Sequence, residues 1–95
     1  MSHDPPPVQT LPTWAEGAIV VETYDADAML DDGVAPVGPV LQRARSLAVG
    51  EVLLVQATFA PSPLVARAAA DGHQAELIDD GDGQFRVYIG ATAPG

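Results

Sequence analysis

The sequence contains no cysteine and no lysine, and only two histidines, His3 and His73. Without cysteine, this chain alone can form no disulfide, thiolate nucleophile, zinc–thiolate site or iron–sulfur ligation. One histidine near the start and one far along the chain make a poor set of metal ligands. Much of the chemistry of metalloenzymes and thiol enzymes is therefore excluded before any motif is considered, and we expect no cofactor and no metal.

Positive charge is also scarce. Thirteen acidic residues face four arginines, which gives a formal net charge of −9. Binding to nucleic acid needs several Lys or Arg contacts with phosphates, and anionic membranes attract basic segments. No apolar run approaches the roughly 20 residues of a membrane span. We expect no nucleic acid and no membrane as partner. We also expect a cytoplasmic location, because residues 1–7 lack the basic and apolar regions of a secretion signal.

What the chain does have is enough apolar material for one core, since 47% of its 95 residues are hydrophobic. The prolines at 5, 6, 7 and 12 favour an extended lead-in. We therefore predict a flexible Pro-rich tail over residues 1–16, a folded domain over 17–91 and a frayed end over 92–95. Trp14, the only tryptophan, either folds back onto the domain, which we favour, or contacts a partner.

Hydrophobic patterns predict four strands and two helices. The strands are expected at 19–24, 51–59, 74–78 and 85–89, and the helices at about 40–48 and 63–71, while 25–30 shows no clear periodicity. Gly50 and Gly72 are expected to end the helices, and Ser62 to cap the second one. Residues 79–83 are expected to form a hairpin loop.

The order β-α-β-α-β-β predicts an α/β fold, an α+β two-layer sandwich. The crossover between the first two strands is right-handed and makes them parallel, while the final hairpin is antiparallel. The simplest arrangement is a four-stranded mixed sheet with two helices packed on one face. In the last strand Phe85, Val87 and Ile89 alternate with Arg86 and Tyr88, so we expect one face buried and the other wet.

The charged side chains offer few candidates for chemistry. The acidic runs at 25–29 and 79–83 lack the ligand spacing of a calcium loop, so we interpret them as solvated turn carboxylates. His73 follows a helix-ending glycine, where it can interact with the helix dipole. Arg43 and Arg45 lie on the first helix, and we favour solvated charges over an anion clamp, because prolines remove amide donors from that helix start.

The loop before the first helix carries a family resemblance. The element order and the segment from Leu30 to Leu41 (LDDGVAPVGPVL) resemble the TusA-like, or SirA-like, sulfur-carrier domain, over about residues 19–90. That family typically has Leu-Asp-x-x-Gly-Leu-x-Cys-Pro-x-Pro at this place. Here Pro36 stands at the cysteine, so sulfur transfer is not implied, and Val37 stands at the following proline. Of the two motif prolines only the second is kept, as Pro39, and Gly33 also matches. The chain is more similar to a cysteine-free branch of unknown function that is often found near hemerythrin-like or nitrogen-oxide metabolism proteins. Residues 61–64 and 81–87 are similar to that branch too.

These observations favour a protein-interaction or accessory module over an enzyme, because no acid, base or nucleophile with a tuned environment can be named. The resemblance places the partner-binding surface on the loop that precedes the first helix. The predicted residues are Gly33, Val34, Ala35, Pro36, Val37, Gly38 and Pro39, with Arg43 as a possible flanking contact. The acidic remainder of the chain would steer a partner with a basic surface, and Val37→Asp should abolish its binding.

Two other interpretations stay open. One is a small-ligand or metal-cofactor accessory role in redox or nitrogen-oxide metabolism, with an anion or cofactor held under the proline loop. The other is a purely structural role for the prolines, which would then only stabilise the turn.

Overall fold

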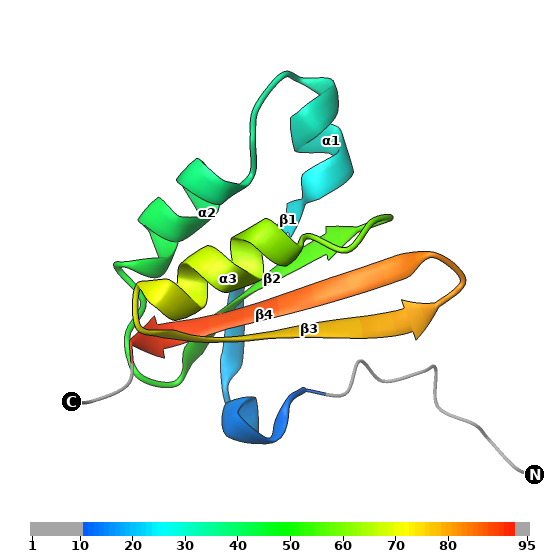
Figure 1. Ribbon diagram of the computed structural model, residues 1–95. Coiled ribbons are helices and arrows are strands. Elements are labelled where there is room, and N and C mark those ends of the chain that lie inside the picture. Colours follow the sequence, from blue (N-terminus) through cyan, green and yellow to red (C-terminus); the bar gives the residue numbers. More distant parts are fainter. Residues whose placement is uncertain (1–10, 93–95) are drawn as a thin grey trace, which may run out of the picture.

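The computed structural model describes residues 11–92, which form a four-stranded sheet with helices on one side (Figure 1). No helix in that range is both long and apolar enough to cross a membrane. Along the chain the elements are the 3-10 helix η1 (Thr13–Ala15), β1 (Ile19–Asp25), α1 (Ala26–Asp31), α2 (Val37–Ala44), β2 (Glu51–Ala57), α3 (Ser62–Ala70), β3 (His73–Gly81) and β4 (Gln84–Thr92).

The sheet has the strand order β1-β2-β4-β3. β1 and β2 are parallel, whereas β4 runs antiparallel to both β2 and β3. Helices α1, α2 and α3 cover a single face (Figure 1), and they contribute to one main core with the strands beneath them. The predicted two-layer sandwich with a mixed four-stranded sheet is therefore confirmed, with three helices instead of two.

The side chains of the central strand β2 are buried on both faces of the sheet. Val52, Leu53, Leu54 and Val55 are all buried, as expected for a strand covered on both sides. Leu53 and Val55 join the main core under the helices, while Val52 and Leu54 join a second, smaller cluster on the opposite face. Successive side chains alternate between the faces, so one strand serves both clusters.

The prediction of a wet second face was wrong. Arg86 and Tyr88 are only 7% and 1% exposed. Tyr88 is covered because the segment around η1 folds back over this side of the sheet, while Arg86 pairs with Asp80 and donates to Tyr88. Trp14 packs there against the cluster that contains Tyr88, which confirms the favoured interpretation of this tryptophan. In Figure 1, η1 lies on the side of the sheet away from the helices. Residues 11–16 are therefore packed on the sheet and do not extend as a tail, whereas 1–10 and 93–95 lie outside the described residues.

The helix boundaries differ from the predicted ones for local reasons. α1 was missed, although Asp25 caps it by accepting a hydrogen bond of 3.1 Å from the backbone N–H of Ala28. α2 begins at Val37 and ends at Ala44, so Gly50 is not its end. Ser62 is the first residue of α3 and makes no capping hydrogen bond.

The final hairpin is longer and tighter than predicted. Asp82 and Gly83 both have positive φ, +55° and +75°, which is the signature of a two-residue type I′ turn. Most of the expected loop therefore belongs to the strands β3 and β4. The strand register shifts between Asp79 and Gly81 in β3, and also between Val20 and Glu22 in the other edge strand, β1.

Candidate functional site

The predicted partner-binding loop connects α1 to α2, and the structure divides its residues into two groups. Gly33, Val34 and Ala35 are exposed, with Val34 at 40%. Val37 is only partly exposed, because it packs against the main core. A Val37→Asp substitution would therefore place a charge beside the core, and loss of binding would not separate docking from folding.

The rest of the loop is the start of α2. Pro36 occupies the N-cap position, and its carbonyl accepts a hydrogen bond of 3.0 Å from the N–H of Val40. Gly38 and Pro39 follow in the first helical turn and are exposed. Proline suits this turn because its missing N–H would have no intrahelical partner there. The two prolines thus shape the helix start.

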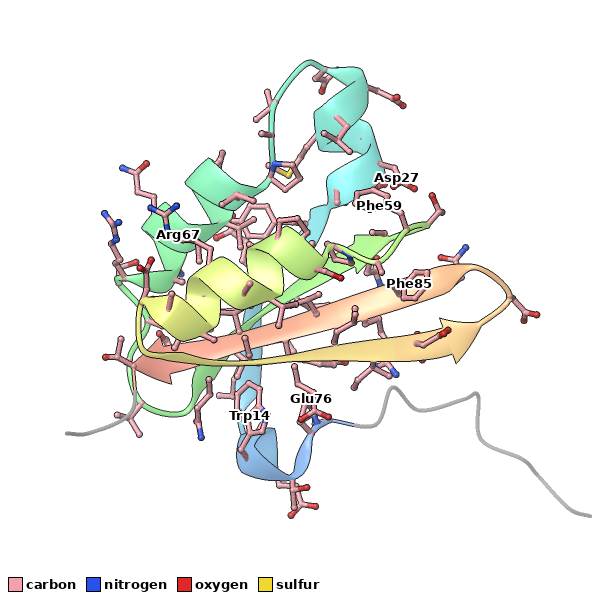
Figure 2. The ribbon with its side chains drawn as sticks, viewed as in Figure 1. Trp14, Asp27, Phe59, Arg67, Glu76 and Phe85 are labelled. Carbon is pink, nitrogen blue, oxygen red and sulfur yellow. The ribbon has the colours of Figure 1, made fainter. Side chains whose placement is uncertain are left out.

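Exposed apolar side chains do occur in α1 and next to it. Leu30 is 48% exposed and Phe59 is 38% exposed. Asp27 joins α1 to the end of β2, because its carboxylate accepts hydrogen bonds from the N–H of Thr58 at 3.3 Å and from its hydroxyl at 2.7 Å. Figure 2 shows Asp27 and Phe59 at the same end. We call this surface the α1 tip: Leu30, Val34 and Phe59 with the carboxylates of Asp27, Asp31 and Asp32.

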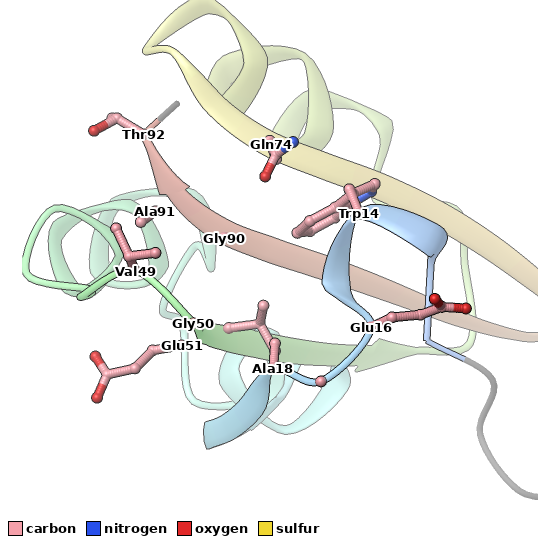
Figure 3. A pocket seen from close by; sticks show the side chains of 12 residues that line it. Trp14, Glu16, Ala18, Val49, Gly50, Glu51, Gln74, Gly90, Ala91 and Thr92 are labelled. Atoms are coloured by element: carbon pink, nitrogen blue, oxygen red, sulfur yellow. The ribbon is translucent and has the colours of Figure 1, made fainter. Parts of the chain in front are cut away.

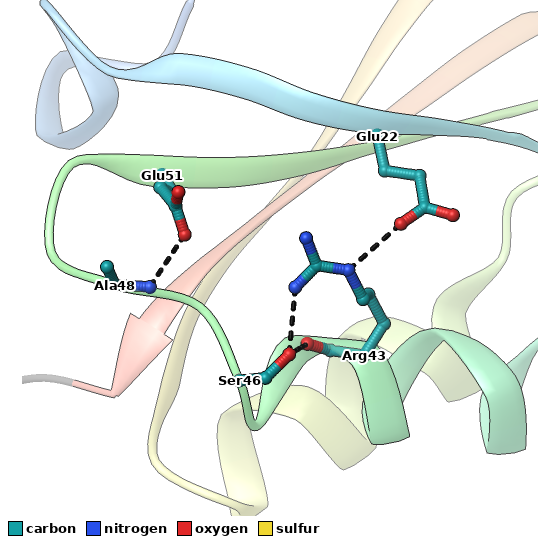
Figure 4. A network of polar contacts seen from close by, with 5 residues as sticks. All are labelled: Glu22, Arg43, Ser46, Ala48 and Glu51. Atoms are coloured by element: carbon teal, nitrogen blue, oxygen red, sulfur yellow. Dashed lines mark hydrogen bonds and ion pairs between the residues drawn. The ribbon is translucent and has the colours of Figure 1, made fainter.

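The predicted flanking contact, Arg43, is engaged elsewhere. Its Nε donates to a carboxylate oxygen of Glu22 on β1 at 2.9 Å, and its Nη1 donates to the hydroxyl of Ser46 at 2.8 Å (Figure 4). The Ser46 hydroxyl donates in turn to the carbonyl of Arg43. Burial of the Tyr24 side chain, followed by the negative charge of the neighbouring Glu22, raises the pKa of the Tyr24 hydroxyl. Arg43 therefore holds α2 to β1, and the structure does not bring it to the α1 tip.

His73 is a structural residue. It is 5% exposed, and its Nδ1 donates to the carbonyl of Gly90 at 2.9 Å. Its partner is thus on strand β4, and the predicted interaction with the end of the preceding helix is not the one observed. Among residues 11–92 no three His, Asp or Glu side chains cluster so as to hold a metal ion.

The acidic runs have local partners. Asp25 caps α1, and Asp79 accepts a hydrogen bond of 2.8 Å from the N–H of Gly81. Asp80 forms a two-point ion pair with Arg86, with contacts of 2.6 Å and 2.7 Å. The interpretation as turn carboxylates fits Asp79, whereas the pairing of Asp80 was missed.

The Arg86 pair is the most enclosed charged group on the second face of the sheet. Beyond its two bonds to Asp80, Arg86 donates from Nη1 to the Tyr88 hydroxyl at 2.7 Å. The hydrogen bond from Arg86 lowers the pKa of Asp80, and the same bond raises the pKa of Arg86. Nε, Nη1 and Nη2 all have protein partners, so this guanidinium stabilises the fold and offers little to a ligand.

A depression of about 260 Å³ lies beside Trp14 on this face (Figure 3). Its wall includes the indole, which sits over Gly90, where an added Cβ would come within 2.8 Å of the ring. The indole Nε1 donates to Glu76 at 3.2 Å. Glycine at position 90 is thus what allows the tryptophan to approach the sheet, a contact between residues 76 positions apart that no local pattern could show.

Comparison with known proteins adds no family: no protein-family model, curated protein or solved structure matches the chain. The assignment of function therefore depends on the geometry of the chain itself.

Proposed function

We propose that this protein is a small interaction module that docks a partner protein through the α1 tip. The observation that carries the proposal is that three apolar side chains are exposed on segments next to α1: Leu30 in α1, Val34 just after it, and Phe59 directly after Thr58, whose hydroxyl donates to Asp27 of α1. An apolar patch rimmed by polar residues is typical of a protein interaction site.

The charges around the patch indicate the kind of partner. Asp31 and Asp32 are exposed beside Leu30, and the whole chain carries a net charge of −9. A basic rim on the partner would complement these carboxylates and accelerate the encounter. We therefore infer a partner that presents an apolar contact surrounded by Lys or Arg.

The resemblance to TusA-like domains supports the same end of the molecule. The strands and the two longer helices follow the order β-α-β-α-β-β, with α1 as an addition. In that family the loop before the first of these helices is where partners dock. The resemblance supplies no activity, because proline stands where the family has its cysteine.

The test compares two single substitutions, each of which introduces one negative charge, at opposite ends of the sheet. Wild type, Val34→Asp and Val49→Asp are immobilised and used to capture proteins from a lysate of the source organism. Val49 is 88% exposed and directly precedes Gly50 and β2, so its substitution is a matched control. We expect a protein that wild type and Val49→Asp retain and that Val34→Asp loses.

The captured protein is then purified and its affinity measured at two salt concentrations. Val34→Asp should weaken binding at least tenfold while its circular dichroism spectrum stays unchanged, and added salt should weaken binding to the wild type. Equal capture by Val34→Asp and wild type would contradict docking at the α1 tip.

A further inference from the structure

The four arginines of this acidic chain fall into two classes. Arg43 and Arg86 form short contacts with carboxylates, at 2.9 Å and 2.6 Å. Arg67 has only Asp71, at 3.9 Å, and its side chain stays 63% exposed. Arg45 has no carboxylate within 4.0 Å among residues 11–92. Two cations are thus left weakly neutralised in a protein with thirteen acidic residues.

These two arginines line the same groove. Val37 and Leu41 lie four residues apart on one face of α2, and Arg45, the C-cap residue of this helix, follows after four more. With Arg67 and Asp71 they border a groove of about 230 Å³ between α2 and α3. Figure 2 shows Arg67 on the side of α3 that faces α2. The groove therefore combines an apolar stretch with two guanidinium groups.

We propose that this groove binds a small carboxylate with a short apolar tail. Guanidinium groups present paired N–H donors that match the two oxygens of a carboxylate. Val37, which is partly exposed, offers contacts for a few methylene groups, while Leu41 is only 5% exposed and lies beneath it. The volume is below the roughly 300–1,000 Å³ of pockets for drug-sized ligands, so only a small molecule or the end of a larger one fits.

The charge around the groove favours a ligand with a single negative charge. Two arginines and Asp71 leave a formal local charge of +1 around the groove. At physiological ionic strength, charges beyond about 8 Å are largely screened, so the net charge of the whole chain does not cancel this site. The 3.9 Å separation of Arg67 and Asp71 exceeds the about 2.7–2.9 Å of a charge-assisted hydrogen bond. Arg67 is therefore able to turn toward a ligand.

The test is a titration of the ¹⁵N-labelled protein with butyrate, followed by amide chemical shifts. Inorganic phosphate is titrated separately, and sodium chloride at equal ionic strength gives the background. We expect saturable shifts at α2 and α3 with butyrate and weaker binding of phosphate. Arg45→Gln and Arg67→Gln should each reduce butyrate affinity at least fivefold.

Arg43→Gln is the matched control, since it removes the same charge from the same helix but from an arginine held by Glu22. It should leave butyrate affinity within twofold of wild type. Val34→Asp should also leave it unchanged, so this inference and docking at the α1 tip can fail independently. Shifts that do not saturate, that sodium chloride reproduces, or that survive Arg45→Gln would overturn the site. Tighter binding of phosphate would overturn the assignment to a carboxylate.

Discussion

The two faces of the sheet are buried by different means. On one face, three helices supply apolar side chains such as Val40, Leu64 and Ala68 to a large continuous core. On the other, a short segment around η1 covers a small cluster built on Ala15 and Tyr88, next to an ion pair. The same strands feed both faces, so the difference comes from what covers them. Polar side chains at every second position of a strand are therefore exposed to solvent only if no other segment of the chain packs over them.

The largest expected effect is on the helical face. Leu53→Ala should lower the free energy of unfolding by about 2–5 kcal/mol, because Leu53 is fully buried in the main core and truncation leaves a cavity. Leu54→Ala, the matched change on the other face, should cost less, since its smaller cluster can relax. Urea denaturation measures both. An equal cost for the two substitutions would show that the faces are equally well packed.

A smaller effect is expected where the tryptophan meets the sheet. Gly90→Ala should cost about 1–3 kcal/mol by overpacking, because its Cβ would come within 2.8 Å of the indole. The fluorescence of the single tryptophan should shift to the red as the ring is displaced.

The energetic effect of the contact between Gly90 and Trp14 can be isolated by repeating the substitution in a protein that lacks the indole. In Trp14→Ala protein, Gly90→Ala should lose most of its cost, since the atoms that it would meet are gone. Gly38→Ala, where an added Cβ meets nothing within 4 Å, serves as the control and should not destabilise. An undiminished cost of Gly90→Ala without the indole would place the strain elsewhere.

The smallest effect is expected from the ion pair, and it depends on pH. The folded state lowers the pKa of Asp80 below its ordinary 3.8 through the hydrogen bond from Arg86. The pair therefore stabilises the fold above that value, and this contribution is lost as pH falls through the folded-state pKa. Asp80→Asn should be less stable than wild type at pH 7, with a difference that shrinks toward pH 2. Thermal unfolding at several pH values measures it, and a difference independent of pH would contradict this role for the pair.

Local patterns were enough to predict most of the fold. Glycine and proline at the element ends and the apolar run at 52–55 indicated the order of strands and helices, which then restricted the topology to one simple sheet. They failed where distant segments decide the outcome. Nothing in the alternation of β4 indicates that Tyr88 is covered by residues far earlier in the chain. The missed α1 had a usable signal in Asp25, a good capping residue directly before Ala26.

The partner-binding loop stays a prediction, and the structure shows only which of its residues are exposed. Positions 34 and 37 are both valine, and only the start of α2 at Val37 determines which of them packs against the core. Phe59 could not be related to this loop from sequence, because only the hydrogen bonds of Thr58 to Asp27 place the end of β2 next to α1. The weakly paired Arg45 and Arg67 lie on different helices and could likewise be related only in three dimensions.

The register shifts in the two outer strands also bear on solubility. A sheet edge with regular, unpaired backbone groups is a template for addition of another chain. Here β1 is interrupted between Val20 and Glu22, and β3 between Asp79 and Gly81, and both edges carry acidic side chains. Such breaks bend a strand locally and oppose continuous pairing. In a protein whose Ile19 and Val20 are exposed on an outer strand, such irregularities oppose the addition of further strands to the sheet.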